Sequence, residues 1–208
     1  MYWKDNNIIE LRASTSGISG FAVPSKPEDW APTGDALFCD GLFSDAADSY
    51  QKAHMSREAA IAKAHQLEQE ARQIKLHVTG RRSRAFKEAA EAFLTCASAQ
   101  ASPGERTDFL RHAGQCFAEA KRHDLAAKAY LDASMFTMSV CHYRLAQKLY
   151  DAMAITRAHN GLIEDDVVES VTETAKYVWT NEQKFKYVRV CILSFSFHNF
   201  VLAVKLRN

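Results

Sequence analysis

The stretch that decides the fold runs from residue 110 to residue 133 and reads LRHAGQCFAEAKRHDLAAKAYLDA. The residues that form its pattern stand 3, 9, 4 and 3 positions apart: Gly114, Phe117, Ala126, Tyr130 and Ala133. A small residue on one helix lets a second helix cross closely, and alanines around an aromatic residue on the second helix fill the crossing. A glycine inside a helix costs about 1 kcal/mol relative to alanine, so Gly114 indicates a close contact. The stretch predicts a tightly packed helix pair.

The same pattern occurs 80 residues earlier, in the stretch WAPTGDALFCDGLFSDAADSYQKA of residues 30–53. Its members are Gly34, Leu37, Ala46, Tyr50 and Ala53. A large apolar residue stands four positions before each glycine, Trp30 in the first copy and Leu110 in the second. Partial copies are read at Ala146, Tyr150 and Met153 and at Ala89, Phe93 and Cys96. Internal repetition of helix pairs predicts a stack in which each pair covers the next.

Start and stop signals place helices over most of the chain. Ser102, Pro103 and Glu105 form a capping-box start, and Ser25, Pro27 and Glu28 form a similar one. Helices are expected over residues 56–76, 83–101, 124–137, 140–159 and 163–179. Gly80 is expected to end the first of these, and Asn160-Gly161 to end the fourth. The prediction is an all-α fold, a right-handed superhelical stack of antiparallel helix pairs over residues 25–184, between an irregular segment, 1–24, and an apolar segment, 185–208.

Composition limits the function classes. The 208 residues include 26 Lys and Arg against 25 Asp and Glu, a net charge of +1 that gives no global attraction for a polyanion. The five cysteines are an odd number without a CxxC pair, which argues against a disulfide framework and a zinc knuckle. Residues 1–11 lack the apolar core of a secretory signal. An intracellular protein of the cytoplasm or nucleus is expected.

The repeat resembles the tetratricopeptide repeat. Seven positions of that repeat are filled in the first copy: Trp30, Gly34, Leu37, Gly41, Ala46, Tyr50 and Ala53. Two departures follow from the spacing. Two repeats of about 34 residues would span about 68, less than the 80 observed, so the helices between the copies must be longer than the family's. Lys121 also stands where the first copy has Gly41, so that turn must form without glycine.

The longer sequence from about Pro27 to Lys184 resembles the helical-repeat segment of large fungal UvrD-like, superfamily-1 helicase-like proteins. These proteins are related to tetratricopeptide-and-ankyrin-repeat helicases. Gly34-Asp35-Ala36-Leu37-Phe38 and residues 85–93, AFKEAAEAF, carry this likeness. None of the ATPase motifs of that family is present, since no G-x-x-x-x-G-K-[ST] sequence occurs. The resemblance implies a segment without the motor.

Candidate catalytic and metal residues are few. His112 and Cys116 stand at i and i+4, with His123 beyond, a spacing that can hold a metal, but a zinc site needs two more convincing ligands. No G-x-S-x-G nucleophile elbow occurs. No catalytic residue, metal site or cofactor is therefore assigned, and an enzyme is not expected.

Arg81, Arg82 and Arg84 form a compact basic cluster that could touch phosphate or an acidic peptide. The favoured interpretation is a solvated turn whose cations lie near the C-terminus of the preceding helix. Residues 188–204 are apolar and aromatic, and three readings stay open for them: a buried terminal helix, an aberrant end and a membrane span, the last disfavoured by Arg189, His198 and Asn199.

These observations predict a non-catalytic protein–protein interaction or scaffold module. Its partner would be a protein or peptide bound on the concave face, or a neighbouring domain of a larger parent. The alternative is an accessory fragment of a UvrD-like ATP-dependent helicase. Nucleic acid and membrane are not expected as partners of this chain alone.

Overall fold

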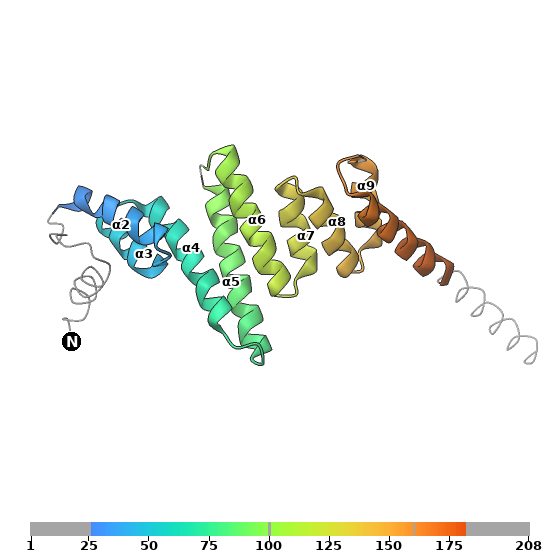
Figure 1. Cartoon of the computed structure of the whole chain (residues 1–208), viewed down its shortest axis with the longest axis horizontal. Coiled ribbons are helices and arrows are strands. Elements are labelled where there is room, and N and C mark those ends of the chain that lie inside the picture. The colour runs from blue at the N-terminus through green and yellow to red at the C-terminus, as the bar shows by residue number, and fades with distance from the viewer. Residues whose placement is uncertain (1–25, 100, 160, 182–208) are drawn as a thin grey trace, which may run out of the picture. The chain divides into compact units, whose positions relative to one another are not determined.

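The computed structural model describes residues 26–99, 101–159 and 161–181, which form helices joined by short turns (Figure 1). The elements are a 3-10 helix, η1 (Pro27–Asp29), and the helices α2 (Trp30–Cys39), α3 (Phe43–Lys52), α4 (Ser56–Gln73), α5 (Thr79–Ser98), α6 (Pro103–Glu119), α7 (His123–Asp132), α8 (Phe136–Leu145) and α9 (Leu149–Ala158). A further helix occupies residues 165–181. The described residues contain no strand, so the all-α prediction is confirmed.

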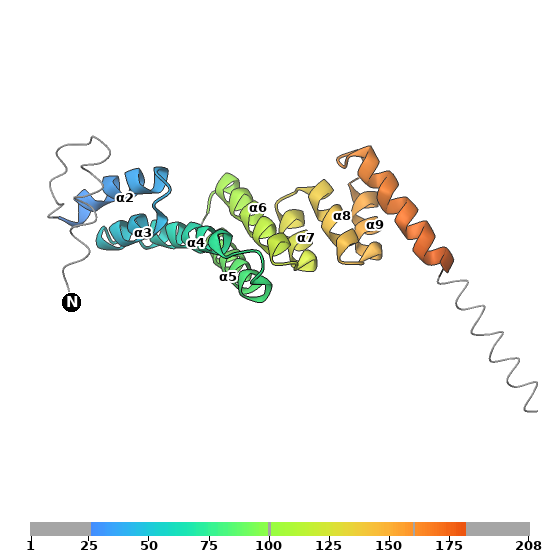
Figure 2. The same ribbon diagram turned by 60° about the horizontal axis from the view of Figure 1, so that its bottom comes forward.

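The chain divides into two compact units, Met1–Ser102 and Pro103–Asn208. In the first unit α2 packs on α3, α3 on α4, and α4 on α5. Figure 1 shows α4 and α5 as a long helical hairpin, and Figure 2 shows the shorter α2 lying over α3. The hairpin helices have 18 and 20 residues, whereas α2 and α3 have ten each. The helices that separate the two copies are therefore longer than α2 and α3.

In the second unit α6 packs on α7, α7 on α8, and α8 on α9. Three of these helices, α7, α8 and α9, have ten residues each. The core between them consists of small and medium apolar side chains: Ala127, Val140, Tyr143, Ala152, Ile155, Ile163 and Val171. Each helix is thus stabilised chiefly by helices that are close to it in sequence.

Buried positions in the second unit recur every 13 residues, once per helix and turn. One series consists of fully buried small side chains: Ala113, Ala126, Ser139 and Ala152. A second series, four positions later in each helix, consists of larger buried side chains: Phe117, Tyr130, Tyr143 and Thr156. The Ser139 hydroxyl donates a hydrogen bond to the Ala127 carbonyl at 2.8 Å, so the polar member is satisfied across α7 and α8. In the second unit the burial pattern therefore recurs with each helix and its turn.

The turns between the short helices share one conformation, with a left-handed residue after each helix. In the first unit these residues are Gly41 and His54, and in the second they are Lys121, Ser134 and Gln147. At Lys121 the N–H donates to the Ala118 carbonyl at 3.0 Å, and the next N–H donates to the Phe117 carbonyl at 2.9 Å. This bonding is the Schellman pattern, which satisfies helix-terminal carbonyls. The turn predicted to form without glycine does so through Lys121, whose φ is +60°.

Several predicted boundaries are wrong. The single helix expected over 140–159 is two helices, because the left-handed turn at Gln147 separates α8 from α9. The helix expected over 124–137 ends at Asp132. Gly80 does not end a helix but lies in the first turn of α5. The partial copy read at Ala146 and Tyr150 is also wrong, since Ala146 caps α8 and Tyr150 is 75% exposed.

Candidate functional site

The two predicted glycines lie directly against the aromatic residues of their own copies. A Cβ placed on Gly34 would meet a ring carbon of Tyr50 at 2.7 Å, and one placed on Gly114 would meet a ring carbon of Tyr130 at 2.8 Å. Both distances are too short for real Cβ contacts, so the close crossing inferred from the sequence is present in each unit. These residues set the distance between helices and are not accessible for binding, since Tyr50 and Tyr130 are 5% and 2% exposed.

The other repeat positions serve the same packing. The buried ones are Ala46, Leu110, Phe117, Ala126 and Ala133. The half-buried ones are Trp30, Leu37, Gly41 and Ala53. The Trp30 ring also carries the Lys52 ammonium group 4.2 Å from its centroid. The repeat pattern therefore describes the scaffold, and a binding site must be sought elsewhere.

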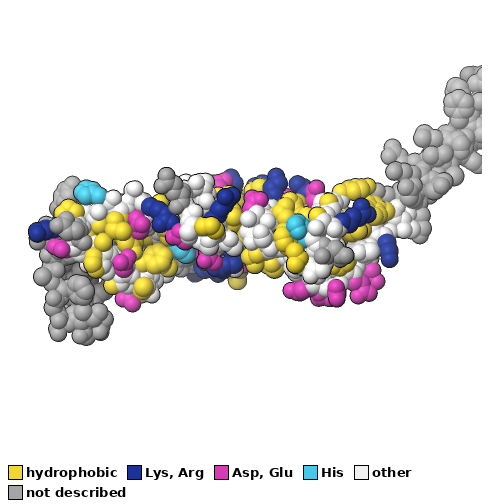
Figure 3. Space-filling model, turned by 90° about the horizontal axis from the view of Figure 1, so that it is seen from above, with side chains coloured by type: hydrophobic (Ala, Val, Ile, Leu, Met, Phe, Trp, Pro, Cys, Tyr) yellow, Lys and Arg dark blue, Asp and Glu magenta, His cyan; other side chains and the backbone are white. Residues whose placement is uncertain are grey.

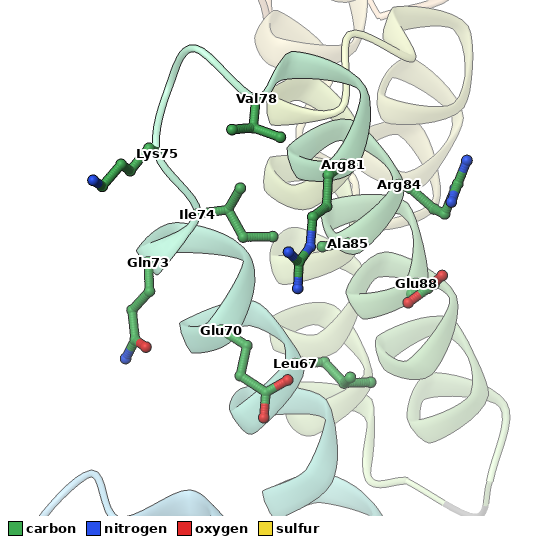
Figure 4. A pocket seen from close by; sticks show the side chains of 10 residues that line it. All are labelled: Leu67, Glu70, Gln73, Ile74, Lys75, Val78, Arg81, Arg84, Ala85 and Glu88. Atoms are coloured by element: carbon green, nitrogen blue, oxygen red, sulfur yellow. The ribbon is translucent and has the colours of Figure 1, made fainter.

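A cavity of about 640 Å³ opens between the end of α4 and the start of α5, and we call it the α4–α5 pocket (Figure 4). Its apolar lining residues are Leu67, Ile74, Val78 and Ala85. Its charged lining residues are Glu70, Lys75, Arg81, Arg84 and Glu88, and Gln73 completes the wall. The pocket combines a small apolar surface with three cations and two carboxylates, which is the composition of a site for a charged and partly apolar ligand.

The arginine cluster noted in the sequence is divided by the fold. Arg82 donates to the carbonyls of Ile74 and Arg72 at 3.2 and 3.4 Å, and its guanidinium lies 4.8 Å from the Phe86 ring centroid. Arg82 therefore ties the end of α4 to α5, and its charge lies near the C-terminus of the preceding helix as expected. The solvated-turn interpretation is wrong in its location, because all three arginines lie inside α5. Arg81 and Arg84, in contrast, line the pocket.

Arg81 and Arg84 are exposed, and neither forms an ion pair within the described part of the chain. Figure 4 shows Arg81 directed into the pocket beside Ile74, whereas Lys75 points away from it. The first turn of α5 contains Arg81 and no acidic residue. A cation at the positive end of a helix macrodipole is unfavourable by about 0.3–1 kcal/mol, so Arg81 stands where folding alone disfavours it.

Charge elsewhere on the molecule is mixed. On the face shown in Figure 3, small groups of Lys and Arg side chains and small groups of Asp and Glu side chains lie among apolar side chains. Such a mixture gives no extended field of one sign along that face. Local chemistry at the pocket, and not a general positive potential, would therefore select a ligand.

The candidate metal residues do not converge as the sequence spacing suggested. Cys116 is buried in the packed stripe of α6, and His112 is half buried on the same helix. His123 lies against a residue that the sequence analysis did not select, His142, with 3.2 Å between their Nδ1 atoms. Burial, and then the nearby His123, lower the pKa of His142. The sequence around His142 does not predict its contact with His123, because that contact depends on how α7 and α8 pack.

The described cysteines, Cys39, Cys96, Cys116 and Cys141, are free thiols. Burial raises the pKa of the Cys96 and Cys141 thiols. A raised pKa disfavours the thiolate that nucleophilic catalysis needs. Burial therefore gives neither of these two thiols the lowered pKa that is typical of a reactive cysteine.

No helix among the described residues has the length and apolar character needed to cross a membrane. The three interpretations of residues 188–204 concern a segment outside the described residues. The segment 1–24, which was predicted to be irregular, also lies outside them. Comparisons of the chain with protein-family models, with curated proteins and with solved structures found no match.

Proposed function

We propose that this chain is a non-catalytic protein–protein interaction module whose helix pairs form a right-handed, tetratricopeptide-like stack. The observation that carries the proposal is the duplicated crossing, in which Gly34 and Gly114 each receive a tyrosine ring from the following helix. Duplicated helix pairs that pack on their sequence neighbours are the building principle of α-solenoids, which bind proteins and peptides on extended faces.

The repeat differs in length from that of the resembled family. Lys121 and Gln147, which follow the first helices of the successive pairs α6–α7 and α8–α9, are 26 residues apart, whereas a tetratricopeptide pair spans about 34 residues. Shorter helices give each pair a smaller face. Binding energy would therefore come from a few local contacts, and the α4–α5 pocket is a place in the described part of the chain where charged and apolar side chains occur together.

A peptide-library selection tests the proposal. The purified chain is immobilised, displayed peptides are selected against it, and selected sequences are synthesised and titrated by calorimetry. The module reading predicts saturable one-to-one binding in the micromolar range or tighter. Gly114→Leu, which disturbs the scaffold, serves as the control for binding to the folded chain.

Two results would contradict the proposal. Hydrolysis of a nucleoside triphosphate would show catalysis if the activity stays with the chain through successive purification columns. Selection that yields no binding peptide, together with salt-sensitive capture of an oligonucleotide, would instead support an accessory segment of a nucleic-acid-dependent ATPase.

A further inference from the structure

We propose that the α4–α5 pocket binds an acidic segment of a partner protein, with a partner carboxylate on the Arg81 guanidinium and a neighbouring apolar side chain on Ile74 and Val78. This inference rests on the proposed function and names the chemistry of its partner. It commits the pocket to a peptide in which Asp or Glu alternates with Leu or Phe.

The first argument is charge. Arg81 and Arg84 line the pocket without an ion pair in the described part of the chain, whereas the Lys75 side chain points away from it (Figure 4). A guanidinium binds a carboxylate through two parallel N–H···O bonds, which gives geometric selectivity as well as attraction. Arg81 also stands in the first turn of α5, where the helix macrodipole favours an anion over a cation. A bound carboxylate would offset the unfavourable placement of this arginine.

The second argument is the apolar lining. Val78 is 38% exposed and Ile74 is half buried, and both lie in or beside the turn that joins the two helices. Covering them with a leucine or phenylalanine side chain removes apolar surface from water. A pocket that served inorganic phosphate alone would have no use for this surface.

The third argument separates a peptide from a nucleic acid. Glu70 and Glu88 stand on the pocket wall and would repel a continuous phosphate backbone. The lining contains no aromatic side chain on which a base could stack. A peptide can place its carboxylate on Arg81 and keep its other groups away from the two glutamates. Discrete acidic residues between apolar ones therefore fit the pocket better than a nucleic acid does.

Arg81 and the neighbouring Arg82 differ in what they contribute to the fold. Arg82 holds the carbonyls at the end of α4, whereas Arg81 makes no hydrogen bond or ion pair among the described residues. Arg81→Glu should therefore leave the melting temperature unchanged or raise it. A binding defect in that variant would then be separable from a folding defect.

The test uses fluorescence anisotropy of the full chain with a labelled decapeptide, Gly-Ser-Glu-Leu-Asp-Phe-Glu-Leu-Gly-Ser. A second peptide replaces its three carboxylates by Gln, Asn and Gln. Arg81→Glu is expected to weaken binding of the acidic peptide by about tenfold or more, and Ile74→Ser to weaken it severalfold. The matched control is Lys128→Glu, because Lys128 is an exposed cation on α7 outside the pocket and the charge change is the same.

Equal weakening by Arg81→Glu and Lys128→Glu, or equal affinity for the acidic and amide peptides, would overturn the proposal. Arg81-dependent binding of a single-stranded oligonucleotide that is tighter than that of the peptide would also overturn it, in favour of a nucleic-acid contact. Library-selected peptides that bind Arg81→Glu with unchanged affinity would place the binding site elsewhere. That last outcome would leave the proposed function intact, whereas a library that yields no binder would remove the function itself.

Discussion

The two copies of the helix crossing have the same centre and different surroundings. In the first copy the Tyr50 hydroxyl donates to an Asp35 carboxylate oxygen at 2.7 Å. In the second copy the Tyr130 ring stacks on His142, with 5.3 Å between ring centroids. The contact between glycine and ring is shared, whereas the groups that hold the ring differ. The comparison indicates that steric fit defines the repeat and that each copy stabilises its tyrosine with its own neighbours.

The copies also differ in their turns. Gly41 has φ +74° with open space around it, and Lys121 adopts φ +60° in the equivalent turn. A left-handed conformation is easy for glycine and costs other residues about 1–2 kcal/mol. The second copy therefore holds a strained residue that the first copy avoids, and the packing of α6 against α7 must offset this cost.

Among changes that disrupt the glycine–tyrosine contact of the two copies, Gly114→Leu is expected to have the largest effect on stability. Its side chain would enter the volume of the Tyr130 ring, and overpacking of this kind lowers the free energy of unfolding by about 1–3 kcal/mol. Gly34→Leu should cost a similar amount through Tyr50. Urea denaturation followed by far-ultraviolet circular dichroism measures both.

The matched control on the same helix is Gly104→Leu, because a Cβ at Gly104 meets nothing within 4 Å. This variant should be neutral or slightly stabilising, since glycine is a poor helix former. A loss at Gly104 equal to that at Gly114 would contradict the assigned crossing. In a Tyr130→Leu background, Gly114→Ala should cost less than it does in the native chain, because the ring it meets is absent.

The turns should respond with opposite signs. Gly41→Ala is expected to lower the free energy of unfolding by about 1 kcal/mol, from backbone conformation alone. Lys121→Gly relieves a similar strain, but the freedom of glycine in the unfolded chain offsets about 0.4–1 kcal/mol of the gain. Thermal melts of the two variants should therefore move apart. Destabilisation by both would mean that Lys121 contributes contacts that outweigh its backbone strain.

Tyr50→Phe should sharpen the difference in surroundings. Loss of its hydrogen bond to Asp35 is expected to cost about 0.5–1.5 kcal/mol. Tyr130→Phe should cost less, because the described residues place no hydrogen-bond partner at the Tyr130 hydroxyl. Burial, and then the Asp35 hydrogen bond, raise the pKa of Tyr50, so its contribution is complete below about pH 10 and is lost at higher pH. Equal losses in the two Phe variants at neutral pH would contradict this difference.

The smallest expected effect is a loss of stability at mildly acidic pH that arises beside the second copy, at His142 of α8. Burial and His123 lower the pKa of His142, so the folded chain binds this proton less readily than the unfolded chain. The contribution of neutral His142 is present above its unfolded pKa of about 6.5 and is lost as the pH falls through the lower folded pKa. The urea concentration at the unfolding midpoint should therefore decrease when the pH is lowered from 7 to 5. His142→Phe keeps a ring beside Tyr130 and should reduce that fall, and an unaltered pH profile would contradict the assignment.

Much of the scaffold could be predicted from local sequence signals. Pro103 begins α6 as its capping-box pattern indicates, and the spacing of Gly114 and Tyr130 locates a contact between two helices. Both signals are strong because a proline and a glycine restrict or permit backbone geometry in ways that few neighbours can override.

The missed boundaries have a common cause. His54, Lys121, Ser134 and Gln147 take the left-handed conformation without being glycine, so four of the five repeat turns lack the usual stop signal. The helix expected over 140–159 continued through Gln147 for this reason. Packing of the ten-residue helices, and not the preference of the turn residue, decides where these helices end.

The sequence by itself determined that the chain is helical, that two glycine–tyrosine crossings recur 80 residues apart, and that longer helices separate them. The tertiary structure decided what the arginine cluster does, because the turn after α4 directs Arg82 to backbone carbonyls and Arg81 to the α4–α5 pocket. The sequence alone does not distinguish the roles of three arginines that lie so close together. Their partners depend on the direction in which α5 returns along α4, and only the packed hairpin sets that direction.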